Sequence, residues 1–236
     1  MSLLSSASIL AKIAWLRLVR GRTYYITIVL ALVPLLLAAL EQGSHPKSPW
    51  NAAVEATLRF VVPLGAAIHV SGAVGDELEQ RTFTYLWSRP IPRSSVVVGR
   101  LLIMIPLLFA LSVVVLGLSF AIASTGVDAE DFARAIGACA ASTIVCCIFA
   151  VGGGALFPRQ PMLFTIGVFL TVEQFLFAIP AAKYLSIVAH SRVLAGLDPE
   201  DTNMTAAAVG LTLLGAIWLA IALFRVSTAE YAAAKE

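Results

Sequence analysis

The sequence predicts an all-α membrane protein whose chain crosses the bilayer several times. Hydrophobic residues make up 59% of the 236 residues and charged residues only 13%, and the mean hydropathy is +0.90. Soluble domains are about half apolar, so a soluble core of this size could not bury so much apolar surface. The net charge of +2 and the lack of basic tracts argue against a nucleic-acid-binding protein.

Residues 1–23 are predicted to form a helix that lies along the lipid headgroups. An apolar stripe recurs at helical spacing, with Trp15 suited to the interface, and its members are Leu3, Ala7, Leu10, Ala14 and Leu18. A removable signal peptide is the alternative, but the basic residues begin late and more membrane segments follow.

Six apolar segments follow this helix. A bilayer core about 30 Å thick requires about 20 apolar helical residues. The segments that reach or approach this length are residues 24–40, 52–74, 96–123, 132–157, 161–182 and 205–225. Pro34, Pro63 and Pro106 interrupt these runs, which membrane helices tolerate. The sequence therefore predicts one domain, residues 1–236, with six transmembrane helices.

The basic residues predict the orientation of the chain. If the N-terminus is cytoplasmic, the inner segments carry 11 Lys and Arg residues and the outer segments 4, with Arg59 inside a span. Inner loops are enriched in Lys and Arg. We therefore expect a multi-pass protein of the cell (inner) membrane with both termini in the cytoplasm.

The stretch Gly75–Arg100 is the one long polar interruption of the chain. It begins with acidic residues, has an aromatic centre, and is broken by Arg89-Pro90-Ile91-Pro92-Arg93. Proline lacks a backbone donor and restricts the residue before it. We expect a short helix on the cytoplasmic side between spans two and three.

The run Glu77–Arg93, followed by Gly99-Arg100-Leu101, together with six spans and a preceding surface helix, resembles the membrane permease subunit of type-2 ATP-binding-cassette (ABC) exporters. The resemblance implies a homodimer, or a pseudo-dimer with a related permease, that binds two copies of a separate ABC ATPase. ATP and magnesium would be bound by that partner, and this chain would be no enzyme and bind no cofactor. The implied function is ATP-driven export of a drug, lipid, glycan or similar substrate.

In this resemblance the short helix is the coupling helix that docks on the ATPase. Aromatic side chains dominate such contacts and charged residues surround them. The expected docking residues are Glu77, Glu79, Arg81, Thr82, Phe83, Tyr85, Leu86, Trp87, Arg89 and Arg93. The alternative is an amphipathic turn bound to headgroups, with its aromatic residues in lipid.

Arg59 and Glu173 are ionisable residues within the second and fifth apolar spans. Counted from the outer ends of their spans, both lie about 10 Å deep at about 1.5 Å per residue. A lone charge in hydrocarbon costs several kcal/mol, so we expect the two to pair or to line a wet cavity. A structural bridge and a polar wall of the transport cavity are the two interpretations.

Other features have plainer explanations. Gly152-Gly153-Gly154 lacks the pattern of a phosphate loop, so close helix packing is favoured. Cys139, Cys146 and Cys147 lack metal-site spacing and are interpreted as packing residues. His69 is interpreted as a buried helix-to-helix donor. The half-apolar loop of residues 183–204 is expected to fold onto or into the outer membrane face, with a solvated loop as the alternative.

Three other functions are alternatives to an ABC permease. An ion- or proton-coupled transporter would use Glu173, His69 and Arg59 as a relay and need no ATPase. A membrane enzyme is disfavoured because the sequence contains no HExxH or GxSxG motif, and no catalytic residue or metal site is predicted. A membrane scaffold without transport activity stays open.

Overall fold

The computed structural model describes residues 11–12, 15–16, 23–42, 48–73, 94–123, 127–198 and 203–228. Within the predicted interfacial helix, the described pairs Ala11–Lys12 and Trp15–Leu16 are helical. The rest of residues 1–22, and the predicted coupling helix within residues 74–93, lie outside the described residues.

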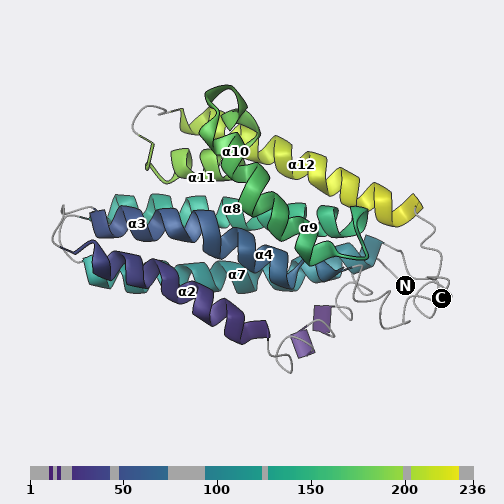
Figure 1. Cartoon of the computed structure of the whole chain (residues 1–236), viewed down its shortest axis with the longest axis horizontal. Coiled ribbons are helices and arrows are strands. Elements are labelled where there is room, and N and C mark those ends of the chain that lie inside the picture. Colours follow the sequence, from purple (N-terminus) through teal and green to yellow (C-terminus); the bar gives the residue numbers. More distant parts are fainter. Residues whose placement is uncertain are drawn as a thin grey trace.

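The described residues form helices, and no strand occurs among them (Figure 1). In chain order they are α2 (Thr23–Leu40), α3 (Ser48–Ala56), η1 (Thr57–Val61), α4 (Val62–His69), α7 (Ser94–Ala123), α8 (Ala129–Leu156), α9 (Pro161–Gly167), η2 (Val168–Val172), α10 (Glu173–Ala178), η3 (Pro180–Leu185), α11 (Ile187–Leu194) and α12 (Met204–Thr228). The segments η1 and η2 are π-helical turns and η3 is a 3₁₀ helix.

Five helical stretches of this part of the chain are long and apolar enough to cross a membrane. They are Pro49–His69, Ser94–Ala123, Ala129–Leu156, Pro161–Ala178 and Met204–Thr228. The apolar part of α2, Tyr25–Leu40, is shorter. The all-α polytopic membrane fold is thus confirmed, while α2 as a sixth span remains a prediction.

The predicted fifth span, residues 161–182, ends earlier in the structure than predicted. Helix α10 stops at Ala178, and Ile179 adopts an extended conformation with φ −98° and ψ 115°. Pro180 follows and opens the 3₁₀ helix η3. Since the residue before a proline is driven out of the α-helical region, the Ile179-Pro180 step accounts for the break.

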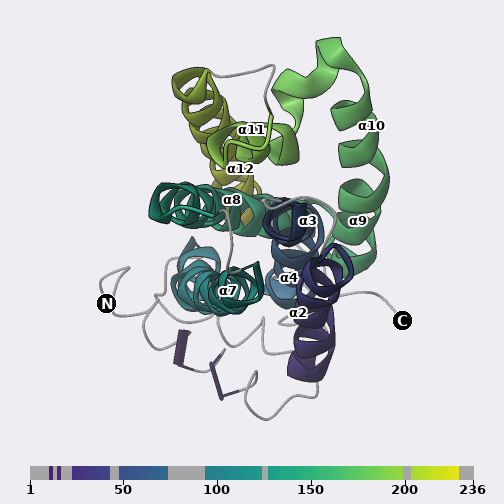
Figure 2. The ribbon, with the colours of Figure 1, turned by 90° about the vertical axis from the view of Figure 1, so that its left-hand side faces the viewer.

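Helix α8 lies at the centre of the bundle. Figure 2 shows it end-on between α12 and α11 on one side and α7 on the other. It packs against α12, α7, α4, α11 and α9. Its buried residues are mostly small, including Ala135, Ala138, Cys139, Cys146 and Ala150. Small side chains let helix backbones approach closely in membranes, so α8 can contact many neighbours at once.

The three consecutive glycines of α8 each face a different element. A side chain at Gly152 would meet the ring and carbonyl of Trp218 in α12. One at Gly153 would meet Phe164 in α9, and one at Gly154 would collide with the backbone carbonyl of Ser71, just after α4. The interpretation of this triplet as a close-packing segment is confirmed.

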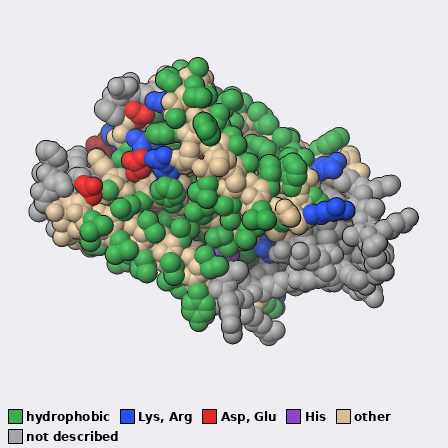
Figure 3. All heavy atoms as spheres, viewed as in Figure 1, with side chains coloured by type: hydrophobic (Ala, Val, Ile, Leu, Met, Phe, Trp, Pro, Cys, Tyr) green, Lys and Arg blue, Asp and Glu red, His purple; other side chains and the backbone are tan. Residues whose placement is uncertain are grey.

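The face of the bundle seen in Figure 3 is mostly apolar among the described residues. Large hydrophobic side chains are exposed on several helices, as with Val29 on α2, Phe175 on α10 and Phe224 on α12. Such extended apolar surface marks a membrane or protein contact. It fits helices that face lipid.

Candidate functional site

The predicted docking residues of the coupling helix lie outside the described residues. They are Glu77, Glu79, Arg81, Thr82, Phe83, Tyr85, Leu86, Trp87, Arg89 and Arg93. What the structure describes is the two helices that carry this segment, α4 before it and α7 after it. Their ends are joined by side-chain contacts.

His69 is the residue at which these two ends meet. Arg100 of α7 donates from Nε to the carbonyl oxygen of His69 at 2.9 Å. The buried His69 ring also forms a hydrogen bond through Nε2 with Oγ1 of Thr27 in α2. The prediction that His69 links helices is confirmed. These two contacts connect α2, α4 and α7.

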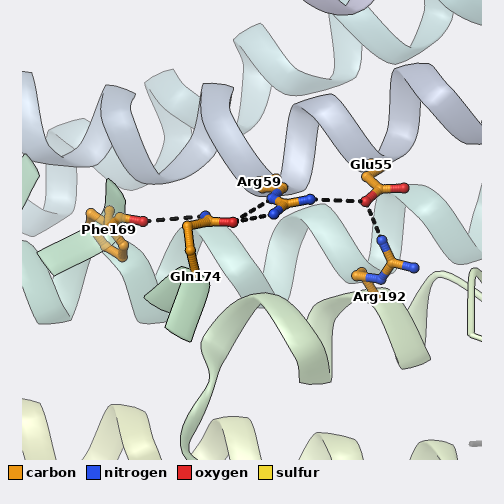
Figure 4. A network of polar contacts seen from close by, with 5 residues as sticks. All are labelled: Glu55, Arg59, Phe169, Gln174 and Arg192. Atoms are coloured by element: carbon orange, nitrogen blue, oxygen red, sulfur yellow. Dashed lines mark hydrogen bonds and ion pairs between the residues drawn. The ribbon is translucent and has the colours of Figure 1, made fainter. Parts of the chain in front are cut away.

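Arg59 lies in the π-helical turn η1 and contacts two neighbouring elements (Figure 4). Its Nε donates to the side-chain oxygen of Gln174 in α10 at 2.7 Å, and Nη2 donates to the same oxygen. Its Nη1 forms an ion pair with Glu55 in α3 at 3.5 Å. Gln174 is in turn oriented by its Nε2, which donates to the carbonyl oxygen of Phe169 at 3.4 Å.

Glu55 also forms an ion pair with Arg192 of α11. Figure 4 shows its carboxylate between the two guanidinium groups. Both of these groups lie near the ring of Phe177, with Cζ to centroid distances of 5.3 Å for Arg59 and 5.0 Å for Arg192. Cations within about 6 Å of an aromatic centroid are attracted to it. We call Glu55, Arg59, Gln174, Phe177 and Arg192 the polar cluster.

Glu173 has different partners. It is only 4% exposed, and its Oε1 accepts from Oγ of Ser186 at 2.8 Å and from the backbone nitrogen of Val188 at 2.7 Å. These groups form the N-terminal end of α11. A carboxylate is stabilised there because the first N–H groups of a helix lack partners and the helix dipole is positive at that end.

The predicted ion pair between Arg59 and Glu173 is therefore wrong, because the two side chains contact different residues. Arg59 binds the neighbouring residue Gln174 instead, so the two spans do meet at this level, through an amide rather than a carboxylate. The reason is direction: successive residues of a helix point to different sides, and Glu173 points toward α11 while Gln174 points toward Arg59. The role of both residues as a wall of a transport cavity stays a prediction.

The loop after span five folds back onto the bundle. Between Ser186 and Val193 most side chains are buried, among them Ile187, Val188 and Ser191. Helix α11 packs against α8 and α12, and Glu173 binds its N-terminal end from within span five. This part of residues 183–204 therefore packs against the helix bundle instead of forming a solvated loop, and its location at the outer membrane face stays a prediction.

Two π-helical turns lie beside the polar cluster. In η1 the N–H of Val62 bonds to the carbonyl of Thr57, and in η2 that of Glu173 bonds to Val168, five residues back in each case. Pro63, which has no N–H, is the second residue of α4, two positions after the end of η1. Single π-turns are rare and occur frequently at functional sites.

Sequence analysis missed Glu55, Gln174 and Arg192. Glu55 precedes Arg59 by four residues, the spacing at which helical side chains pair. The sequence therefore contained enough information to predict this ion pair. Gln174 is uncharged, and Arg192 lies in the loop assigned to the outer face, so only the tertiary structure joins them to the site.

The polar cluster has the composition of a binding or gating site. Among the residues that the structure describes, no group of three or more His, Cys, Asp or Glu residues is placed to hold a metal ion. The cluster likewise contains no nucleophile with an adjacent base. Its side chains can hold helices together or bind a charged group.

Comparison with known proteins places the bundle in a family. A family model described as ABC-2 family transporter protein matches residues 10–179. This range contains every described helix from α2 to α10. It also includes the polar segment before α7. A search among curated proteins gave no match. The match covers well over half of the chain, and the chain therefore belongs to the ABC-2 transporter family, whose membrane domain is the permease component of an ABC transporter.

Proposed function

We propose that this chain is the permease subunit of an ATP-driven exporter and works with a separate ATPase. The observation that carries the proposal is the family match across residues 10–179, which includes the polar stretch between α4 and α7. In this proposal two permease chains, identical or related, associate with two ATPase copies. The substrate leaves the cytoplasm through a cavity between the two permeases.

The ATPase would dock on the coupling helix within Gly75–Arg100. The contacts around His69 support this arrangement because they connect both ends of that segment to three helices. A displacement of the segment would pull on α4 through its chain link and on α7 through Arg100. The bond between His69 and Thr27 would carry it to α2.

The distribution of charge supports a cytoplasmic location for this end of the bundle. The end of α8, the start of α9 and the end of α12 lie at the same end of the molecule as the start of α7 (Figure 1). Arg100, Arg159 and Arg225 lie on or next to these helix ends. Acidic residues gather on the other side, with Asp128, Glu130 and Asp131 at the start of α8. We infer an inner-membrane protein with cytoplasmic termini from the bias of basic residues toward the cytoplasm.

The test is co-purification of the permease with ABC ATPases co-expressed from the same organism, followed by measurement of ATP hydrolysis in liposomes. Phe83→Ala combined with Trp87→Ala should abolish co-purification and permease-dependent hydrolysis, since aromatic anchors dominate such interfaces. Tyr184→Ala is the matched control, because Tyr184 is an exposed aromatic residue (73%) in η3, beyond the far end of span five.

An exporter subunit requires this partner. Transport by the purified chain alone, driven by an ion gradient, would refute the proposal, as would full ATPase binding by the double variant.

A further inference from the structure

The polar cluster contains more positive charge than its contacts neutralise. Two guanidinium groups, Arg59 and Arg192, share the single carboxylate of Glu55. The other nearby carboxylate, Glu173, is directed to the N-terminal end of α11. Arginine remains charged at any pH at which the protein is folded. One positive charge is thus uncompensated among the contacting groups.

The cluster also has more hydrogen-bond donors than acceptors. Two guanidinium groups carry about ten N–H donors. The acceptors that they contact among the described residues are one oxygen each of Glu55 and Gln174. Nε of Arg192 is buried and has no hydrogen-bond partner in this part of the chain. An additional acceptor would satisfy donors that the protein leaves free.

The cluster can be reached from outside the bundle. The side chain of Arg59 is 30% exposed and that of Glu55 37%. Figure 3 shows acidic and basic side chains gathered near α11 on a face that is otherwise largely hydrophobic. Glu55 lies six residues after Pro49, where the second span begins, so it is about 9 Å along the helix from that end.

Charge at this depth favours an anion that brings its own apolar part. An exposed arginine within the hydrocarbon region is costly unless it is paired or hydrated. Guanidinium groups bind phosphates and carboxylates through two parallel hydrogen bonds. The Phe177 ring lies near both guanidinium groups.

We propose that Arg59 and Arg192 form a binding site for the phosphate or carboxylate head of an anionic amphiphile in the outer half of the membrane. Glu55 occupies the site in competition with this ligand, and Gln174 orients Arg59 as a positioning residue. The inference rests on the orientation given under Proposed function but not on an ATPase partner.

The test uses the purified full chain in phosphatidylcholine nanodiscs, with bound phosphatidylglycerol measured by native mass spectrometry. Arg59→Gln should weaken phosphatidylglycerol binding about tenfold and leave phosphatidylcholine unchanged. Glu55→Gln should strengthen phosphatidylglycerol binding, because the competing carboxylate is gone. Arg134→Gln is the matched control: Arg134 is paired with Glu130 four residues away on α8, as Arg59 is with Glu55, and its loss should leave binding unchanged.

The Glu55→Gln variant separates this proposal from a purely structural cluster, which would lose stability without gaining affinity. If Arg59→Gln does not fold, Arg59→Lys replaces it and should also weaken phosphatidylglycerol binding, because lysine cannot form two parallel hydrogen bonds with a phosphate. The stronger binding expected for Glu55→Gln then remains the second test. Equal binding by Arg59→Gln and Arg134→Gln, or weaker binding by a folded Glu55→Gln variant, would overturn the proposal.

The source of the head group is distinguished in liposomes that also contain the ATPase and ATP. Movement of labelled phosphatidylglycerol between leaflets, lost in Arg59→Gln, identifies transported cargo. Binding without movement, also lost in Arg59→Gln, identifies a resident lipid.

Discussion

The glycine segment of α8 and the polar cluster hold the same two spans by opposite means. Near residues 152–154, span two and span five meet α8 by close contact of backbone and ring, at Ser71 and Phe164. At the polar cluster, the same spans meet one another through Arg59 and Gln174. Close packing allows one arrangement, whereas charged side chains can exchange partners. The two spans are thus fixed at the glycine end and adjustable at the polar end.

Gly154→Ala should produce the largest loss of stability. Its new methyl group would collide with the carbonyl of Ser71, which is backbone and cannot rotate away. Overpacking costs about 1–3 kcal/mol, while glycine to alanine in an open helical site stabilises by roughly 0.5–1 kcal/mol. Gly137→Ala, on the same helix with no atom within 4 Å of the added carbon, is the control.

Thermal unfolding in detergent measures this pair of variants. A lower midpoint for Gly154→Ala and an equal or higher midpoint for Gly137→Ala are expected. Equal midpoints for the two would show that span two is not held by close packing at α8.

Glu173→Ala should have the next largest effect. It leaves the hydroxyl of Ser186 and the N–H of Val188 without their acceptor, at a cost of about 1–3 kcal/mol. Glu173→Gln keeps an acceptor and should cost less. Limited proteolysis of residues 183–204 measures the effect, since α11 should detach first. Identical protection in wild type and Glu173→Ala would contradict the anchoring of α11 by this carboxylate.

Charge exchange should give a smaller effect and test the adjustability of the polar cluster. Arg59→Glu alone places two carboxylates together. Adding Glu55→Arg restores the pair but puts an arginine beside Arg192, so only part of the loss should be recovered. Pairs four residues apart on a helix contribute about 0.3–0.5 kcal/mol, so the rescue should be a modest rise in the unfolding midpoint. The double variant Arg59→Glu with Glu173→Arg is the comparison and should not recover. Recovery in this second double variant would indicate that Arg59 and Glu173 pair directly, in contradiction to the contacts seen here.

Apolar runs were sufficient to predict most of the fold. The ends of α7 and α8 fall close to the predicted spans because a helix must continue for the thickness of the hydrocarbon. Ile179-Pro180 indicated that the helix of span five ends early. The apolar residues after Pro180 nevertheless led to a predicted span that extends to residue 182. The π-turns could not be predicted, since an inserted residue leaves the hydrophobic pattern almost unchanged.

The sequence predicted that Arg59 and Glu173 lie at one level of the bundle, but it did not predict which residues they contact. Arg59 and residue 173 do lie at a common level, as rise per residue required. Which of two consecutive side chains faces Arg59 depends on the rotation of α10, and the count of residues carries no information on rotation. Arg192 reaches the polar cluster only because α11 folds back onto the bundle. Its contact with Glu55 joins residues that are far apart in the sequence.

The consecutive residues Glu173 and Gln174 have a consequence for how span five can move. Neighbouring residues on a helix point about 100° apart, so this one turn is gripped on two sides, by α11 through Glu173 and by span two through Gln174. Rotation of α10 about its own axis would break both contacts, and bending at Ile179 would strain the contact with α11, because Glu173 precedes this residue whereas Ser186 and Val188 follow it. Span five is therefore expected to resist rotation about its own axis, and α11 is expected to move together with it rather than separately.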